Sequence, residues 1–233
     1  MMRLPPHPAP GSPSHHSPTG ATLTLPRRLA LLAWAAANGA WIIEDDYDGE
    51  FHYTGRLLPA LKSLDRGQSV IYVGSFSKTL FPALRLGYMV LPARLHDRVT
   101  GAMRLRGATQ PGMAQTVVAR FMADGHFSKH LRRMRTLYRA RRQALTDALE
   151  AMFPTMLTIT PRDGGMQIVA RLPPNIRDTD LVARAALAGI TIQALSQFAM
   201  ADQRDNALVL GFTNLPVEQA WATCEALQCA LAE

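Results

Sequence analysis

The chain has 233 residues, of which 48% are hydrophobic and 18% are charged, and its formal net charge is +7. This apolar content can form one large core or two smaller ones, which excludes a wholly disordered chain. No apolar run reaches the roughly 18 residues of a membrane-spanning helix, and residues 1–8 carry prolines where a signal peptide has an apolar core. These features predict a cytoplasmic protein without a membrane partner.

The positive charge is concentrated in one segment, residues 129–142. Its seven basic residues have no acidic residue among them and equal the whole net excess: Lys129, Arg132, Arg133, Arg135, Arg139, Arg141 and Arg142. Apolar residues recur at helical spacing in the same segment, so most of the basic side chains are expected on the outer face of an amphipathic helix. No nucleic-acid-binding motif accompanies them, which favours a solvated or partner-facing helix over a DNA-reading one.

The first 20 residues are rich in proline, serine and histidine and show no periodicity, which predicts a loop or a disordered N-terminus. His15 and His16 are adjacent there, and a flexible segment lacks the fixed geometry of a metal site, so we expect a solvated tail. Cys224 and Cys229 lie five residues apart on a predicted helix, a spacing that suits neither a disulfide nor a zinc pair. The sequence therefore predicts no metal site.

The next segment has the pattern of an α/β fold. A helix is predicted over residues 25–38, with Thr24 as its cap and Gly39 at its end. Short apolar runs predict strands at residues 40–44, 70–74 and 87–91. The order helix, strand, connection, strand implies parallel pairing of the first two strands. Further helices are predicted over residues 94–106, 113–123 and 127–152.

Beyond the long helix the pattern changes to that of an α+β domain. Strands are predicted at residues 155–160, 166–172, 190–194 and 207–212, and helices at residues 179–188 and 216–231. The expected organisation is a loop or disordered N-terminus at 1–20, a partial large α/β domain at 21–125 and a small α+β domain at 126–233.

Lys78 follows the predicted strand 70–74, with Ser75 and Ser77 before it and Arg85 seven residues after it. A lysine amine can form a Schiff base with an aldehyde when its surroundings lower its pKa, and hydroxyl and guanidinium groups suit a phosphate. Pyridoxal phosphate carries both an aldehyde and a phosphate. A surface Lys-Thr pair after a strand is the alternative that this motif alone leaves open.

An acidic cluster, residues 44–48 (EDDYD), lies at the carboxyl end of the first predicted strand, where open α/β sheets bind ligands. A solvated acidic turn, or a metal site that includes nearby His52, would account for it. A third explanation joins the cluster to Lys78. A carboxylate keeps a pyridine nitrogen protonated, and a phenol can hydrogen-bond the 3-hydroxyl of the same ring.

Four stretches together resemble the aminotransferase-like domain of MocR-type regulators: SPSHHSPTG (12–20), WIIEDDYDGEF (41–51), VGSFSKTLFPALRLGY (73–88) and GHFSKHLRRMR (125–135). In that family a GntR-type winged helix precedes a fold type I, pyridoxal-phosphate-binding domain related to class I/II aminotransferases. The resemblance implies an α/β chain that holds the C-terminal part of the large domain and the small α+β C-terminal domain.

By position, the resemblance makes Lys78 the catalytic lysine that holds pyridoxal 5′-phosphate as a Schiff base. Asp45 resembles the partner of the pyridinium nitrogen, and Tyr47 resembles the phenol near the 3-hydroxyl. Asp46 and Asp48 are then expected to be loop carboxylates.

The resemblance also supplies phosphate ligands. Ser75 and Arg85 match the family's phosphate-binding positions, and Ser77 is a weaker candidate.

Two departures from the family pattern concern the ligands. The chain has SPTG where many aminotransferases have Asn-Pro-Thr-Gly, so the asparagine that bonds the 3-hydroxyl is absent. The run Val209-Leu-Gly-Phe212 lacks the arginine that grips a substrate carboxylate. Arg171 or Arg204 could replace it, although both also fit ordinary surface arginines.

The resemblance implies that a winged helix and the front half of the large domain would precede residue 12. We therefore expect an N-terminally truncated chain in which strand 40–45 has an exposed edge. The function expected is effector sensing for a transcriptional regulator, with pyridoxal phosphate and a small amine or amino acid as ligands. An active class I/II aminotransferase, or a degenerate fragment with an incomplete cofactor site, is the alternative. The intact protein is expected to be a homodimer that contacts DNA only through the winged helix.

Overall fold

The structure is a computed structural model that describes residues 9–55, 58–107, 112–160, 162–199 and 206–232. These residues group into two compact units. Unit 1 comprises the described residues within 1–16, 21–50 and 55–132. Unit 2 comprises the described residues within 17–20, 51–54 and 133–233. The domain boundaries predicted at residues 20 and 125 stay a prediction.

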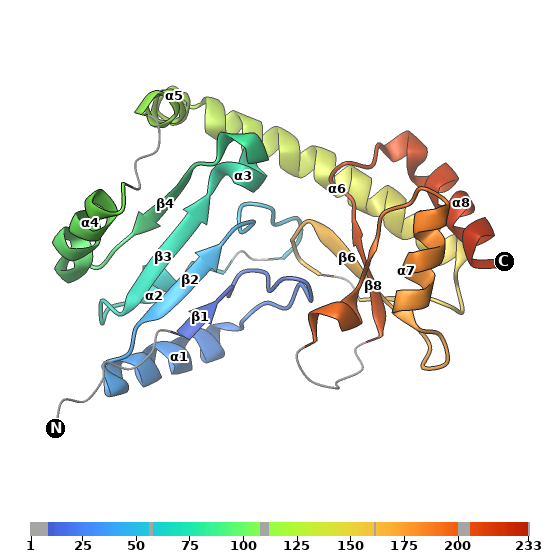
Figure 1. Cartoon of the computed structure of the whole chain (residues 1–233), viewed down its shortest axis with the longest axis horizontal. Helices are drawn as coiled ribbons and strands as arrows, with labels where there is room; N and C mark the ends of the chain where they lie inside the picture. The colour runs from blue at the N-terminus through green and yellow to red at the C-terminus, as the bar shows by residue number, and fades with distance from the viewer. Residues whose placement is uncertain (1–8, 56–57, 108–111, 161, 200–205, 233) are drawn as a thin grey trace. The chain divides into compact units, whose positions relative to one another are not determined.

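Unit 1 is an α/β unit whose elements are labelled in Figure 1. Its strands are β1 (Ala9–Gly11), β2 (Ile42–Asp46), β3 (Val70–Ser75) and β4 (Gly87–Val90). Its helices are α1 (Leu25–Asn38), α2 (Leu61–Leu64), α3 (Phe76–Thr79), α4 (His96–Leu105), α5 (Gly112–Ala123) and the first part of α6 (His126–Met152), with short 3-10 turns at Pro82–Leu84 and Ala93–Leu95.

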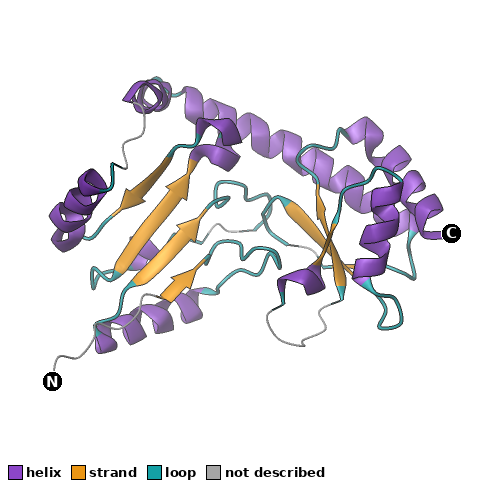
Figure 2. Ribbon diagram, in the orientation of Figure 1, coloured by secondary structure: helices purple, strands orange, loops and turns teal. Residues whose placement is uncertain are grey.

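The strands of unit 1 form a sheet in the order β1-β2-β3-β4, drawn in orange in Figure 2. β2 runs parallel to both β1 and β3, whereas β4 is antiparallel to β3. The parallel pairing of β2 and β3 that the sequence predicted is confirmed. Because these two strands are parallel, their carboxyl ends lie at the same edge of the sheet.

The N-terminal segment differs from the sequence prediction. Residues 9–11 form a strand that pairs with β2 in the register Ala9↔Ile42 to Gly11↔Glu44. The expectation that β2 exposes an edge was therefore wrong, as was that of a structureless segment throughout residues 9–20. A three-residue strand is stabilised by backbone hydrogen bonds and needs no apolar alternation that a sequence pattern could reveal.

One hydrophobic core cluster of unit 1 lies between the sheet and two helices. Ala35 of α1 and Leu61 of α2 pack with Ile42 and Val70 of the sheet. α1 has the predicted bounds, and Gly39 ends it in the left-handed conformation, with its N–H bonded to carbonyls of the last turn. This packing fixes which face of β2 is buried.

Unit 2 has the α+β pattern predicted for this part of the chain. Its elements are the rest of α6, β5 (Thr158–Ile159), β6 (Gln167–Arg171), α7 (Asp178–Leu187), β7 (Gln193–Ala194), β8 (Ala207–Gly211) and α8 (Ala220–Ala232), with 3-10 turns at Leu195–Phe198 and Val217–Gln219. The strands form an antiparallel sheet in the order β5-β6-β8-β7. Among the described residues, no helix combines the length and the apolar character needed to cross a bilayer.

The amphipathic pattern predicted for α6 is present. Leu131 and Leu145 are buried, and Arg132 is exposed. Arg142 is half-buried, its guanidinium stands 5.7 Å from the centre of the Tyr53 ring, and burial lowers its pKa. Most of the basic residues of this helix therefore face solvent, while Arg142 belongs to the packing of unit 2.

Candidate functional site

Lys78 lies directly beyond the carboxyl end of β3, in the short helix α3. Ser75 ends the strand and caps α3, because its Oγ accepts a hydrogen bond from the N–H of Ser77 at 3.1 Å. Lys78 is exposed. Burial raises the pKa of the Asp48 carboxyl, and the charge of Lys78 opposes this rise only weakly. The lysine amine is thus accessible at the edge of the sheet where the acidic cluster also lies.

Asp45 lies on β2, opposite Val73 of β3 in the parallel register. Side chains alternate along a strand, so Asp45, Val73 and Ser75 share one face of the sheet. The Asp45 side chain is exposed and makes no hydrogen bond with another described residue, and partial burial and the charge of Asp46 raise its pKa. Its carboxylate is therefore open to a ligand.

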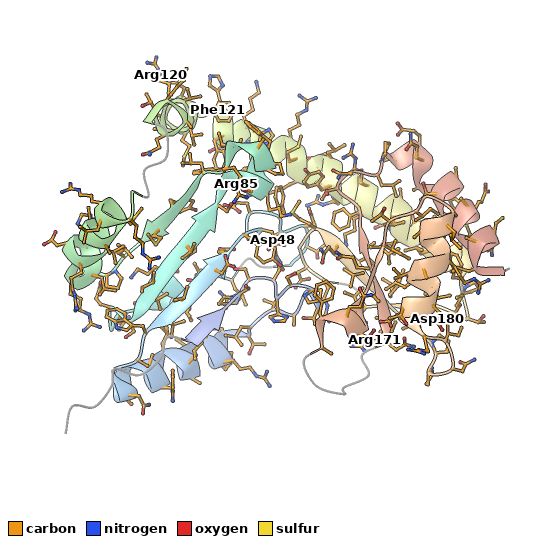
Figure 3. The ribbon with its side chains drawn as sticks, in the orientation of Figure 1. Asp48, Arg85, Arg120, Phe121, Arg171 and Asp180 are labelled. Carbon is orange, nitrogen blue, oxygen red and sulfur yellow. The ribbon has the colours of Figure 1, made fainter. Side chains whose placement is uncertain are left out.

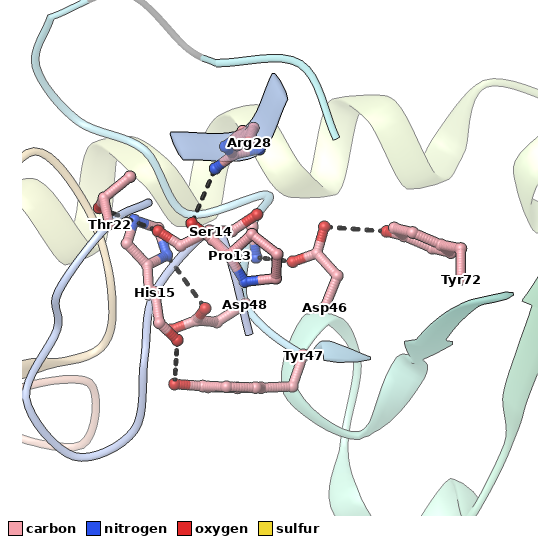
Figure 4. A network of polar contacts seen from close by, with 10 residues as sticks. Pro13, Ser14, His15, Thr22, Arg28, Asp46, Tyr47, Asp48 and Tyr72 are labelled. Atoms are coloured by element: carbon pink, nitrogen blue, oxygen red, sulfur yellow. Dashed lines mark hydrogen bonds and ion pairs between the residues drawn. The ribbon is translucent and has the colours of Figure 1, made fainter. Parts of the chain in front are cut away.

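Tyr47 follows β2, and its hydroxyl donates a hydrogen bond to the backbone carbonyl of His15 at 2.8 Å. The next residue, Asp48, lies 3.0 Å from Nδ1 of the same histidine. Figure 4 shows both contacts. The phenol predicted to face the cofactor is thus fixed to the loop that follows β1.

Asp46 is not the loop carboxylate that the sequence predicted, whereas Asp48 does lie in the loop after β2. Asp46 is the last residue of β2 and accepts hydrogen bonds from the Tyr72 hydroxyl at 3.0 Å and the Gly49 N–H at 3.0 Å. Asp48 is 3% exposed, and burial raises its pKa while the His15 contact lowers it. Both carboxylates have partners within the protein.

Arg85 lies near the amino end of β4, where its backbone adopts the left-handed conformation with φ 50° after a 3-10 turn. Its side chain is exposed. Figure 3 shows Arg85 beyond the end of β3 and Asp48 beyond the end of β2. The turn therefore carries a guanidinium to the same edge of the sheet as Lys78.

Gly74 in the Lys78 motif has a packing role. A Cβ at this position would lie 2.3 Å from Cζ of Tyr88, so the tyrosine ring occupies the space that a side chain would need. Tyr88 lies across from Gly74 on β4. This part of the motif is explained by the space that the Tyr88 ring occupies.

Other sequence predictions concern positions away from this site. Val209, at the position where the resemblance leads us to expect an arginine, lies in β8 and is 2% exposed. Arg171 ends β6, and Arg204 lies outside the described residues. Within the described part of the chain, no three metal-ligating side chains come together, including around His52.

Sequence reasoning missed two buried groups. His15 was placed in a solvated tail, yet it is 5% exposed and pairs with Asp48. Arg28 is 1% exposed and donates to the carbonyls of Pro13, Leu23 and Pro59. Its spacing of seven residues from buried Ala35 on α1 was a usable signal, because such residues share a helix face.

The site therefore combines an amine, an open carboxylate, a fixed phenol, two serine hydroxyls and a guanidinium at one edge of a parallel sheet. Such an edge is where open α/β sheets bind ligands. The amine can condense with a carbonyl group, and the hydroxyls and guanidinium can bind an anion.

Comparison with known proteins agrees with this chemistry. The family model "Aminotransferase class I and II" matches residues 13–218. The uncharacterized HTH-type transcriptional regulator YhdI of Bacillus subtilis is 35% identical over 221 residues, which are 95% of this chain and 47% of that protein. The probable rhizopine catabolism regulatory protein MocR of Rhizobium meliloti is 36% identical over 204 residues, 88% of this chain and 41% of the relative.

A solved structure shows the same fold. LysN, an alpha-aminoadipate aminotransferase from Thermus thermophilus complexed with N-(5′-phosphopyridoxyl)-L-leucine, superposes with a TM-score of 0.87 at 30% identity, covering 99% of this chain and 60% of LysN. The chain spans about half the length of the curated relatives it matches. Its fold is that of the aminotransferases, and the chain belongs to the aminotransferase class I and II family.

Proposed function

We propose that unit 1 binds pyridoxal 5′-phosphate through Lys78, and that the chain is the effector-sensing, aminotransferase-like part of a MocR-type transcriptional regulator. The observation that carries the proposal is the placement of Lys78 and Asp45 at the carboxyl ends of two adjacent parallel strands. This placement offers an amine and a carboxylate to the two functional ends of one aromatic cofactor.

The residues present fit this cofactor. Asp45 would hold the protonated ring nitrogen, and it is suited to that role because its carboxylate is not used by another described residue. Tyr47 would lie by the 3-hydroxyl. The phosphate would be bound by the Ser75 hydroxyl and the Arg85 guanidinium, with Ser77 as a further ligand. When bound, the cofactor supplies an aldehyde and an electron-withdrawing ring, and the chain binds and orients both.

The residue at position 209 in β8 favours a sensing role over catalysis. Val209 is buried where the family pattern has the arginine that grips a substrate carboxylate, so this strand contributes no cation at that position. YhdI and MocR are regulators, which supports the same assignment. The second candidate is an active aminotransferase, which the 30% identity to LysN supports.

The proposal extends to partners. The effector would be a small amine or amino acid, because such a molecule competes with Lys78 for the aldehyde. The intact protein would be a cytoplasmic homodimer, with DNA bound by a winged helix outside this chain.

The sequence makes the cofactor test direct, because it contains three lysines, Lys62, Lys78 and Lys129. Lys62 donates to the Val70 carbonyl within the protein, whereas Lys129 is exposed on α6. Pyridoxal phosphate is added, the adduct is reduced with borohydride, and mass spectrometry locates the modified lysine. We expect the label and a visible absorbance band with the unmodified chain and with Lys129→Ala, and neither with Lys78→Ala.

A label spread over all three lysines, or no band that depends on Lys78, would contradict cofactor binding and favour the alternative of an incomplete site. An amino donor then separates the two candidate functions. Conversion of the bound cofactor to its amine form supports an aminotransferase, whereas a reversible spectral change without conversion supports a sensor.

A further inference from the structure

The start of the loop after β1 is held by several polar contacts. Buried Arg28 donates to the Pro13 carbonyl at 2.7 Å, as Figure 4 shows. The N–H of Leu23 donates to the same carbonyl at 3.0 Å. The Thr22 hydroxyl donates to the Ser14 carbonyl at 3.0 Å. The backbone is thus fixed on the residues directly before His15.

His15 contacts two consecutive residues through two different atoms. Its Nδ1 lies 3.0 Å from Oδ1 of Asp48, and both side chains are almost completely buried. Its backbone carbonyl accepts the hydrogen bond from the Tyr47 hydroxyl at 2.8 Å. One residue therefore holds both the phenol and the carboxylate that follow β2.

The chemistry of these groups fixes the direction of each hydrogen bond. When Asp48 is ionised it can only accept, and Nδ1 of His15 then carries the proton of this hydrogen bond. A backbone carbonyl can also only accept, so Tyr47 uses its one hydroxyl proton on His15. The hydroxyl end of Tyr47 is therefore held by the backbone of the loop that contains His15.

We infer that His15 is a positioning residue for Tyr47, because its side-chain contact with Asp48 holds the backbone carbonyl that receives the Tyr47 hydroxyl proton. That Tyr47 contacts a bound cofactor rests on the proposed function. The positioning of Tyr47 concerns this chain alone and can be measured without a cofactor.

Substitutions at residue 15 separate the side chain from the backbone. The carbonyl that receives the Tyr47 proton remains in every variant, so any change at Tyr47 reports the loss of the side-chain contact that holds this carbonyl. His15→Asn keeps a nitrogen donor attached to Cγ, as Nδ1 is. His15→Gln places its amide one bond farther from the backbone, and His16→Asn changes the adjacent exposed histidine as a matched control.

The first experiment measures nitration of Tyr47 by tetranitromethane in the cofactor-free chain, followed by peptide mass spectrometry. We expect faster nitration of Tyr47 in His15→Ala and His15→Gln, and wild-type rates in His15→Asn and His16→Asn. Circular dichroism checks that each variant is folded. If His15→Ala does not fold, the Asn and Gln variants carry the comparison. Equal nitration of Tyr47 in all folded variants would overturn the inference.

The second experiment measures the affinity for pyridoxal phosphate by its absorbance. We expect His15→Ala to weaken binding by about tenfold, equivalent to about 1.4 kcal/mol, and His15→Asn to restore it. If His15 acts through Tyr47, then His15→Ala should change the affinity by less than roughly twofold in a Tyr47→Phe background. A full tenfold loss in that background would show a merely structural role and overturn the inference.

The two proposals fail in different ways. Wild-type chain that shows no Lys78-dependent absorbance contradicts cofactor binding, while the nitration rates still decide whether His15 positions Tyr47. Normal cofactor binding with unchanged nitration leaves the proposed function standing and contradicts the positioning role.

Discussion

Glu44 and Asp45 are adjacent carboxylates on β2 with opposite environments. Glu44 is 0% exposed and accepts hydrogen bonds from the backbone N–H groups of Leu61 and Lys62 at 2.7 and 2.8 Å. Asp45 is exposed and bonds no other described side chain or backbone group through its carboxylate. The strand therefore uses one carboxylate to build the fold and presents the next one to a ligand.

The difference arises from the two-residue period of a strand. Successive side chains of β2 point to opposite faces of the sheet, and α1 and α2 cover the face of Ile42 and Glu44. A shift of one residue in the register would exchange the two roles. The following predictions test whether the face of Glu44 determines stability and the face of Asp45 determines ligand binding.

The largest effect on stability is expected for Glu44→Ala. This change leaves two backbone N–H groups of α2 without their acceptor and removes the carboxylate that acts on buried Arg28. We expect a loss of about 3 kcal/mol in the free energy of unfolding, measured by urea denaturation. Asp45→Ala is the matched control and should change stability by less than about 0.5 kcal/mol. Equal losses for both variants would contradict the comparison.

The opposite pattern is expected for ligand binding. Asp45→Asn cannot supply the negative charge that a protonated ring nitrogen needs, so the affinity for pyridoxal phosphate should fall roughly 100-fold, about 2.8 kcal/mol. The free energy of unfolding of the cofactor-free chain should stay close to the wild-type value. An Asp45→Asn variant that binds the cofactor normally would remove Asp45 from the site.

Gly74→Ala tests the buried face on the neighbouring strand. The new Cβ would overlap the Tyr88 ring, so we expect a loss of about 2 kcal/mol in the free energy of unfolding. Replacing the ring with a smaller side chain in the double variant Gly74→Ala, Tyr88→Leu should recover part of this loss. No recovery would show that Gly74 is required for another reason.

A smaller effect is expected from pH. Burial raises the pKa of Glu44 above its usual range, so the folded state binds a proton at a pH where the unfolded state does not. The free energy of unfolding should therefore rise as pH falls from neutral through the raised pKa and level off at the ordinary carboxyl pKa. The gain is about 1.4 kcal/mol for each pH unit between the two values. Urea denaturation of Glu44→Gln across this window should show a smaller slope, and an equal slope would contradict the assignment.

Local structure followed from the sequence where the pattern is strong. α1 was predicted at its observed bounds because a helical period, a first-turn proline and a terminal glycine agree. The start of β3 was also predicted, from a short apolar run before a glycine. β1 was not, since its three residues carry no such pattern and become a strand only by pairing with β2.

The candidate site was predictable to a similar degree. Lys78 was identified by its chemistry and its place after a predicted strand, whereas Asp45 was chosen within the acidic cluster by the family resemblance. Both lie at the edge of the sheet where they were expected. His15 was assigned wrongly. Its partner Asp48 is 33 residues away, and no local pattern marks a contact over that distance.

The sequence by itself determined the family, the main helices and strands and the set of reactive groups, because these depend on short-range spacing and residue chemistry. Only the tertiary structure decided that Glu44 and Asp48 are buried while Asp45 is exposed, that Gly74 makes room for a tyrosine ring, and that Tyr47 donates to His15. Each of these depends on which segments pack together, and packing brings together residues whose spacing in the chain carries no signal of contact.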